Sequence, residues 1–338
     1  MMDEGMKLNA CSWRLRAAVA FAGAVFSASP VLAQGKKDVS NYPTRPVRFI
    51  TPAAPGGTTD ILARLFSDRL TRNLKQQFIV DNRASASGVL AAELTTNAAP
   101  DGHTLFLPYH QHIINAALLP KLPYHPIDDF TPITQLTAAA LLLVVHPATP
   151  AKDFKEFLTW AKSYKGSLNF GSAGIGSGGH LSGELFKLMT GVQAVHIPYK
   201  GTGPALAALL GQEYHFNFMG LAAGARMAAT GKLRALGITS AKRAPGLPDI
   251  PTIAEQGLPG FEVEGWYGVM GPKNMPPALV QRLHAELIKI MHTPEMQKTL
   301  INMGSTPIGS TPQQFKSYLV GDLEKWSKVV KASGAKAN

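Results

Sequence analysis

The chain has 338 residues, of which 45% are hydrophobic, and its formal net charge is +11 at pH 7. A chain of this length exceeds the size at which one hydrophobic core usually stops growing, so two domains are expected. The lysines and arginines are scattered, with no basic run interleaved with aromatic residues, which argues against a nucleic-acid-binding protein. The positive charge is compatible with steering of small anionic ligands, or with a plain solvated basic surface.

Residues 1–33 have the composition of a secretory signal peptide. Basic residues in MKLNACSWRLR precede the apolar run AAVAFAGAVFSASP, and the small-residue segment VLA stands before Gln34. The apolar run is short for a membrane span. The single cysteine, Cys11, precedes that run, where it cannot accept the lipid of a lipoprotein. Cleavage would leave no thiol, which excludes disulfides, thiolate metal sites and cysteine nucleophiles from the mature protein.

Short β-rich runs alternate with helical patterns through much of the remaining chain. Such alternation predicts parallel α/β units. The predicted series is strand 47–53, helix 58–75, strand 77–83, helix 87–97, strand 104–109, strand 141–147, helix 153–164, strand 167–172, helix 179–189, strand 194–199, helix 202–211, strand 214–219, helix 221–230 and strand 233–240. Gly191, Gly211 and Gly231 each follow a predicted helix, where a left-handed C-cap is expected.

The pattern changes after the proline-rich segment RAPGLPDIPT. A strand is predicted at 262–272, followed by helices at 276–292, 294–303 and 311–332. Thr311 and Gln314 have the spacing of a capping box at the start of the last helix.

Two strand-like runs, 141–147 and 265–272, bracket a block with its own strands and helices. This arrangement predicts one α/β domain inserted into another. Two crossing strands would join the lobes as a hinge, with a ligand cleft between them. The predicted division is a first domain of residues 35–140 and 268–338 and a second domain of residues 141–267.

Two glycine-rich segments are the strongest candidates for a binding site. TPAAPGGTTD (51–60) and NFGSAGIGSGGHLSGELF (169–186) each lead from a predicted strand into a predicted helix. Free backbone N–H groups at a helix start attract anions, and Ser172 and Ser177 would add hydroxyl groups suited to a small carboxylate. The alternative is that these glycines serve only the shape of a turn.

Asp60 and Arg64 need a separate interpretation. A carboxylate beside an anion site would repel the ligand, so Asp60 is expected to brace the helix start. Arg64, one turn later, is expected to pair with it or to face solvent.

The second segment also fits the dinucleotide pattern G-x-G-x-x-G through Gly174, Gly176 and Gly179. The next strand, however, ends at Tyr199 and Lys200, where an NAD site needs an acidic residue. Export would also separate the chain from the nicotinamide pool, so no cofactor is expected. No G-x-S-x-G nucleophile elbow is present.

The histidines give only weak evidence for chemistry. His110 and His112 alternate in HQH without an HExxH motif or a carboxylate cluster, so no metal site is expected. They are interpreted as polar liners of a ligand pocket or as surface residues. An exported enzyme that uses His110 or His180 as a base is the alternative function, although no nucleophile accompanies either residue at a persuasive spacing. Turnover of a bound ligand would distinguish the two.

Many separate motifs together resemble one family. They include YPTRPVRFITPAAPGGTTDILARLFSDRL, AAPDGHTLFL, DDFTPITQL, LNFGSAGIGSGGHLSGELFK, VHIPYKGTGPALAALL and GKLRALGITSAKRAPGLPDIPTIAEQGLPGFEVEGWYG, and they extend over about residues 42–332. The chain resembles the Bug family, the extracytoplasmic substrate-binding proteins of tripartite tricarboxylate transporters.

This resemblance implies a two-lobed α/β periplasmic binding protein of the Venus-flytrap kind (type II), and not an enzyme. Such a receptor closes on an organic carboxylate and delivers it to two membrane subunits. A monomer in the periplasm is expected. A sensor subunit that presents its closed form to a signalling partner is the second alternative.

The same resemblance implies which residues hold the ligand carboxylate. In the family, the two glycine-rich loops face each other across the cleft, and a third edge follows the strand at 194–199. The corresponding residues are Ala54, Gly57, Thr58 and Thr59 on one lobe, Ser172, Gly176, Ser177 and Gly178 on the other, and Tyr199 and Gly201 at the third edge.

Two departures from the family pattern bear on the ligand. Met219 stands where the family usually has an aspartate, which argues against a ligand with an amino group. The segment PYHQHI replaces a small hydroxyl-rich one and adds Tyr109, His110 and His112 to the expected pocket. These bulkier walls favour a larger or aromatic carboxylate, such as terephthalate, over a small aliphatic one. Phe218 and Trp266 are interpreted as core residues or as additional ring faces of the pocket.

Overall fold

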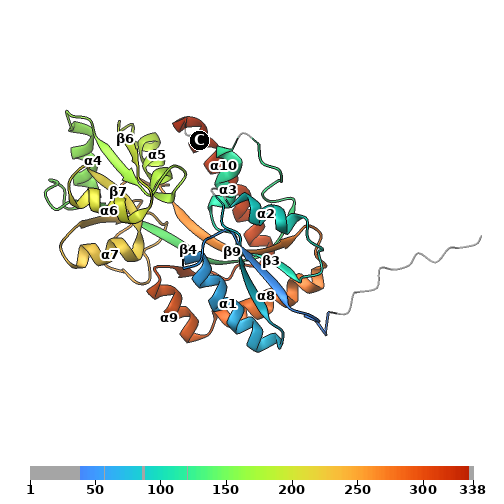
Figure 1. Ribbon diagram of the computed structural model, residues 1–338. Coiled ribbons are helices and arrows are strands. Elements are labelled where there is room, and N and C mark those ends of the chain that lie inside the picture. Colours follow the sequence, from blue (N-terminus) through green and yellow to red (C-terminus); the bar gives the residue numbers. More distant parts are fainter. Residues whose placement is uncertain (1–38, 57, 86–87, 120, 335–338) are drawn as a thin grey trace, which may run out of the picture. The chain divides into compact units, whose positions relative to one another are not determined.

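Figure 1 shows the computed structural model, which describes residues 39–56, 58–85, 88–119 and 121–334. The expected signal peptide, residues 1–33, lies outside the described residues. The described residues between 39 and 334 form one compact unit by their contacts. In the described part of the chain, no helix is both long enough and apolar enough to span a bilayer.

The strands follow the predicted series closely, with two additions noted below. The strands are β1 (Val47–Thr51), β2 (Phe78–Asn82), β3 (Thr104–Phe106), β4 (Phe130–Val145), β5 (Asn169–Ser172), β6 (Val195–Pro198), β7 (Phe216–Gly220), β8 (Arg234–Ile238), β9 (Glu264–Pro272) and β10 (Thr306–Pro307).

The helices also match the predicted ones within about two residues at each end. They are α1 (Thr58–Leu74), α2 (Val89–Thr96), α3 (Gln111–Leu118), α4 (Phe154–Ser163), α5 (Gly178–Thr190), α6 (Thr202–Leu210), α7 (Leu221–Ala229), α8 (Pro277–Met291), α9 (Pro294–Asn302) and α10 (Pro312–Ser333). Helix α3, strand β10 and the first half of β4 are absent from the sequence-based prediction.

Helix boundaries follow from local capping chemistry. The Thr311 side chain accepts the N–H of Gln314, and the Gln314 side chain accepts the N–H of Thr311, so the predicted capping box of α10 is confirmed. Gly191 ends α5 with φ 72°, as predicted. The prediction for Gly211 is wrong, because its φ is −80° and the following Gln212, with φ 59°, adopts the left-handed conformation instead.

The strands form one mixed sheet in the order β2-β1-β3-β9-β4-β7-β5-β6, and β8 and β10 also pair with β4. The predicted parallel pairing is confirmed on both sides of this sheet: β1 is parallel to β2 and β3, and β5 is parallel to β6 and β7. Strands β4 and β9 in the middle are antiparallel to their neighbours. Figure 1 shows this central pair between the elements around α4 to α7 and those around α1, α2 and α8.

Strand β4 changes partner in its middle. It pairs with β9 from Phe130 to Ala140, and with β7 from Leu141 to Val145. The apolar and β-branched run FTPITQLTAAALLLVV allows one strand to be covered on both faces over this whole length. The change of partner falls at the boundary where the sequence predicts that the first domain gives way to the second, and the division itself stays a prediction.

Helix α10 packs against α3, α5 and β4 and thereby contacts elements on both sides of the central strands. Trp266 of β9 is fully buried, and its Nε1 donates to Asp322 of α10 at 2.9 Å. The Trp326 Nε1 donates to the same carboxylate at 2.8 Å. Burial of a large aromatic side chain contributes roughly 2–3 kcal/mol, so this aromatic contact is a main reason why α10 is held on β9. Trp266 is a core residue, one of the two interpretations that the sequence allowed, whereas Phe218 is buried and also lines the smaller cavity described below.

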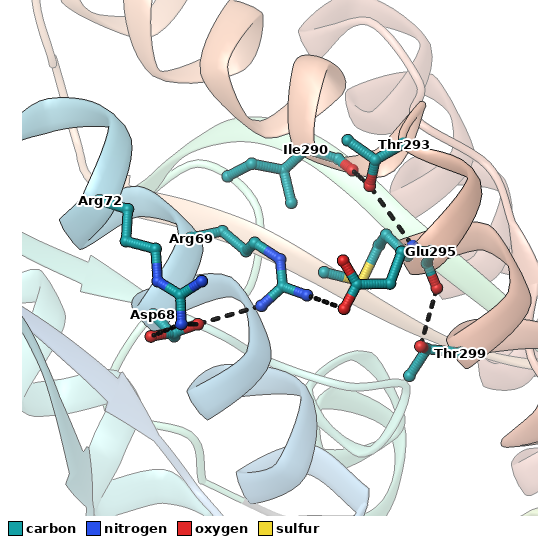
Figure 2. A network of polar contacts seen from close by, with 8 residues as sticks. Asp68, Arg69, Arg72, Ile290, Thr293, Glu295 and Thr299 are labelled. Atoms are coloured by element: carbon teal, nitrogen blue, oxygen red, sulfur yellow. Dashed lines mark hydrogen bonds and ion pairs between the residues drawn. The ribbon is translucent and has the colours of Figure 1, made fainter.

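Charged side chains join α1 to α9 at the surface (Figure 2). Arg69 Nη2 contacts Glu295 Oε1 at 2.7 Å, and Arg69 Nη1 contacts Asp68 Oδ2 at 3.0 Å. Because the Glu295 side chain is 76% exposed, such a pair stabilises the fold by at most about 1 kcal/mol. Thr58 at the start of α1 and Met303, which directly follows α9, line the cavity described below, so this ion pair joins two helices whose opposite ends lie at one cavity.

Candidate anion-binding cleft

A cavity of about 350 Å³ lies where β4 changes partner. It is lined by residues from both halves of the sheet, including the start of α1 and the end of α9. The lining residues are Thr58, His110, Ala139, Ala140, Leu141, Gly178, Thr202, Gly220, Leu221, Ala222, Ala223, Arg226, Gly265, Tyr267, Met303, Gly304 and Ser305.

The starts of four helices converge on this cavity. Thr58, Gly178, Thr202 and Leu221 are the first residues of α1, α5, α6 and α7, and all four line it. The first N–H groups of a helix have no partner within the helix, and the helix dipole places partial positive charge at the same end. Such an end binds anions readily, and four of them around one cavity favour an anion there.

The side chains of the cavity add positive charge and no negative charge. Among the lining residues that the structure describes there is one arginine, Arg226, and no carboxylate. Burial lowers the pKa of the His110 imidazole to about 4, so this ring is neutral at physiological pH. Burial raises the pKa of the Tyr267 hydroxyl to about 12, and this hydroxyl is hydrogen-bonded to the Thr58 side chain. The cavity therefore favours an anion over a cation or an uncharged sugar.

Two glycines allow close approach of the walls. A Cβ at Gly265 would lie 3.1 Å from Nδ1 of His110, so the absence of a side chain on β9 makes room for this ring. A Cβ at Gly304, whose φ is +76°, would lie 3.0 Å from the backbone nitrogen of Ala222. The segment around Gly304 therefore lies directly against the start of α7.

Asp60 braces the first glycine-rich loop, as the sequence predicts. Its carboxylate accepts hydrogen bonds from Arg64 Nε at 3.0 Å, from the Gly56 N–H at 2.9 Å and from Asn82 Nδ2 at 2.9 Å. The hydrogen bond from Arg64, with the other two, lowers the pKa of Asp60 to about 2. Asp60 is not among the residues that line the cavity, and its hydrogen bonds orient the start of α1.

The second glycine-rich loop is held by its own side chains. Ser172 is fully buried, and its Oγ lies 2.7 Å from Nε2 of His196 and accepts the Gly174 N–H at 3.1 Å. The Gly176 N–H donates to Nδ1 of His180 at 3.0 Å. The two histidine rings stack with centroids 4.0 Å apart. Burial lowers the pKa of His180 to about 4 and that of His196 to about 3, so both rings are neutral and fix the loop.

A smaller cavity of about 210 Å³ adjoins the larger one, with which it shares Leu141, Gly178, Thr202 and Gly220. Ser177, which caps α5 by accepting the His180 N–H, lies along it. Its full lining is Leu141, Ala173, Ser177, Gly178, Gly179, Thr202, Ala205, Asn217, Phe218, Met219 and Gly220.

The structure brings together five of the thirteen predicted site residues. Thr58, His110 and Gly178 line the larger cavity, and Ser177 and Met219 join Gly178 along the smaller one. Gly57 lies outside the described residues. Ala54, Thr59, Tyr109, Ser172, Gly176, Tyr199 and Gly201 line neither cavity.

Several of these other residues support the lining without belonging to it. The ring of Tyr109 lies beside that of Tyr267, with centroids 6.3 Å apart. The Tyr199 N–H donates to the Ser172 carbonyl at 3.0 Å, and the Gly201 N–H donates to the Ala173 carbonyl at 3.1 Å. Their direct contact with a ligand stays a prediction.

The interpretation of His112 as a pocket liner or a surface residue is wrong. His112 is buried, its Nε2 lies 2.8 Å from the Pro126 carbonyl, and its ring stacks on Tyr124 and meets Phe130 edge-on. Among the residues that the structure describes, no group of histidines and carboxylates is arranged to hold a metal ion.

Sequence reasoning missed Thr202, Arg226, Tyr267 and Ser305, all of which line the larger cavity. The signal for Arg226 was available, since it is the one charged residue in the helical stretch LAAGARMAA. No local pattern distinguishes Tyr267 or Ser305, because long-range strand pairing and the docking of α9 bring them to the cavity.

A mixed α/β fold with an anion-selective cavity beside its central strands defines a solute-binding protein, and comparison with known proteins identifies the family. Residues 62–335 match the family model described as tripartite tricarboxylate transporter family receptor. Protein BugT of Bordetella pertussis is 34% identical over 297 residues, which cover 87% of this chain and 91% of BugT. The chain belongs to this receptor family, also known as the TctC or Bug family; its members are periplasmic binding proteins and not enzymes.

Two solved structures of relatives contain a ligand. Rpa4515 of R. palustris with adipate is 34% identical, with a TM-score of 0.74, and the match covers 87% of this chain and 99% of that one. MatC (Rpa3494) from Rhodopseudomonas palustris with bound malate is 34% identical, with a TM-score of 0.70 and coverage of 86% and 100%. Both ligands are organic carboxylates.

Proposed function

We propose that this protein captures an organic carboxylate in the periplasm and delivers it to the two membrane subunits of a tripartite tricarboxylate transporter. The ligand is a mono- or dicarboxylate, with aromatic acids such as terephthalate included, and the receptor acts as a monomer. The observation that carries the proposal is the convergence of the starts of α1, α5, α6 and α7 on one cavity that holds an arginine and no carboxylate. The adipate and malate bound by relatives support the same ligand class.

The proposed mechanism is closure of two lobes, residues 35–140 with 268–338 and residues 141–267, around the ligand. Thr58 and Tyr267 would belong to the first lobe, and Gly178 and Thr202 to the second. A ligand that contacts both lobes stabilises the closed form by its differential affinity for that form. The neutral His110 and Tyr267 would then provide hydrogen bonds and aromatic surface, and being uncharged they would neither repel the anion nor form an ion pair with it.

Calorimetric titration of the mature chain tests this function. The panel contains malate, adipate, terephthalate and benzoate, with glutamate, glucose and spermidine as an amino acid, a sugar and a cation. At least one of the four carboxylates is expected to bind, and at a hundred times its Kd it would stabilise the fold by about 2.7 kcal/mol in a thermal melt. Binding of the sugar or the cation alone, or of nothing in the panel, would contradict the proposal.

A further inference from the structure

Arg226 differs from most other arginines of the described chain. Arg48, Arg69 and Arg243 are ion-paired with carboxylates, and Arg234 donates to three backbone carbonyls. Among the residues that the structure describes, the Arg226 side chain has neither an ion-pair partner nor a hydrogen-bond partner, although it lines the larger cavity. Arg226 is exposed and lines the cavity, so its full positive charge is available to a ligand there.

The charge of Arg226 is separated from the helix starts by its position along α7. Ala222, Ala223 and Arg226 all line the cavity, and their spacing of three and four residues puts them on one face of α7. Arg226 lies about one turn, or roughly 6 Å, further along α7 than Ala222 at its start. The facing wall is the segment Met303, Gly304 and Ser305, which has no charged side chain.

The helix starts, with their partial positive charges and free N–H groups, suffice to bind the carboxylate of a monocarboxylate ligand. A second carboxylate on the same ligand would be desolvated in the cavity and would need a full charge or several donors of its own. The Arg226 guanidinium, with its fork of N–H donors, is suited to bind a carboxylate through two parallel hydrogen bonds.

We propose that Arg226 is a specificity-determining residue that binds the second acidic group of a dianionic ligand, so that the receptor prefers a dicarboxylate over the monocarboxylate of the same length. This inference rests on the proposed function, because it assumes that the first carboxylate binds at the helix starts. It narrows the ligand class from carboxylates in general to dicarboxylates.

The opposite wall supports this assignment. His110 and Tyr267 are uncharged at neutral pH, so they neither compete with Arg226 for the second carboxylate nor repel it. The nearest comparable cation in the sequence is Lys232, which is exposed, follows α7 and does not line the cavity. It provides a matched control, since its replacement removes the same unit of charge from the same region.

The test compares each dicarboxylate with its half-amide by calorimetry. The two pairs are adipate with adipamate and terephthalate with 4-carbamoylbenzoate, and the proteins are wild type, Arg226→Gln, Arg226→Lys and Lys232→Gln. For at least one pair, wild type is expected to bind the dicarboxylate about tenfold to a hundredfold more tightly than the half-amide. Arg226→Gln should reduce this ratio to about two or less while the half-amide affinity stays nearly unchanged, Arg226→Lys should recover part of the ratio, and Lys232→Gln should keep it.

The outcomes that overturn the inference separate it from the proposed function. If wild type binds the dicarboxylate and the half-amide equally in every pair that it binds, or if Arg226→Gln keeps the wild-type ratio, the role of Arg226 is refuted and the carboxylate receptor stands. If wild type binds none of the four compounds and none of the wider carboxylate panel, both proposals fail. Because the Arg226 side chain has no partner in the described part of the protein, the glutamine variant should keep the thermal midpoint of wild type.

Discussion

The contact between Gly304 and the start of α7 gives the sharpest test of the proposed closure of the two lobes. A Cβ at position 304 would lie 3.0 Å from the Ala222 nitrogen and 3.1 Å from the Ala222 Cβ. Backbone cannot move aside as a flexible side chain can, so Gly304→Ala must separate the 303–305 segment from α7. Overpacking of this kind costs on the order of 1–2 kcal/mol, and the cost applies only when the two walls are in contact.

The same substitution has a second effect that must be kept apart from the first. Gly304 has φ +76°, and an alanine in this conformation costs about 1 kcal/mol of stability whether the cleft is open or closed. Gly309→Ala is the matched control, because Gly309 has φ +64°, its nearest neighbour is the flexible end of Ile288 at 3.0 Å, and it does not line the cavity.

The assay is calorimetric titration with the tightest-binding carboxylate of the panel, combined with urea unfolding of both variants. Both variants are expected to lose similar stability, and Gly304→Ala alone is expected to bind the ligand about tenfold more weakly. Equal affinity of Gly304→Ala and Gly309→Ala would refute the idea that the ligand-bound state needs this close contact.

The remaining predictions concern the two loops. Asp60→Asn should destabilise the protein by about 1–2 kcal/mol in urea unfolding, because the amide replaces a charged acceptor of three hydrogen bonds. Because the folded-state pKa of Asp60 is lowered to about 2, the stability that its carboxylate contributes is present above pH 4 and is lost as the pH falls from about 4 to 2. If Asp60→Asn lost as much stability as wild type in that pH range, the assignment would be contradicted. The pKa values of His180 and His196 are lowered by burial, so the stability that they contribute is present above about pH 6.5 and lost as the pH falls towards 4. His196→Gln should flatten the stability profile between pH 6.5 and pH 4, and an unchanged profile would show that the ring is not neutral and buried as described.

Local signals account for what the sequence predicted well. The prolines, glycines and N-cap residues that bound α5 to α10 act within a few residues of themselves, so the helix ends could be predicted closely. The same holds for the glycine loops, because a strand followed by glycines and a helix start implies free N–H groups whatever the tertiary structure. Ser177 was predicted for this reason, whereas Thr58 and Gly178 were predicted from the resemblance to the Bug family.

Long-range packing accounts for what could not be predicted. Arg226 and Ser305 come to one cavity only because the segment before β10 is placed beside α7. Ser172 has the same hydroxyl as Ser177, yet its partner is His196 of the neighbouring strand, which no local pattern indicates. His112 is buried by aromatic side chains that follow it in the sequence, and the alternating HQH pattern concealed the short helix α3 to which it belongs.

The crystal structure of the mature protein with its tightest-binding carboxylate tests the central claim most directly. A carboxylate group of the ligand is expected within hydrogen-bond distance of backbone N–H groups at the start of α1 and at the start of α5, α6 or α7. A ligand held away from these helix starts, or one bound by a single side of the cavity, would contradict it.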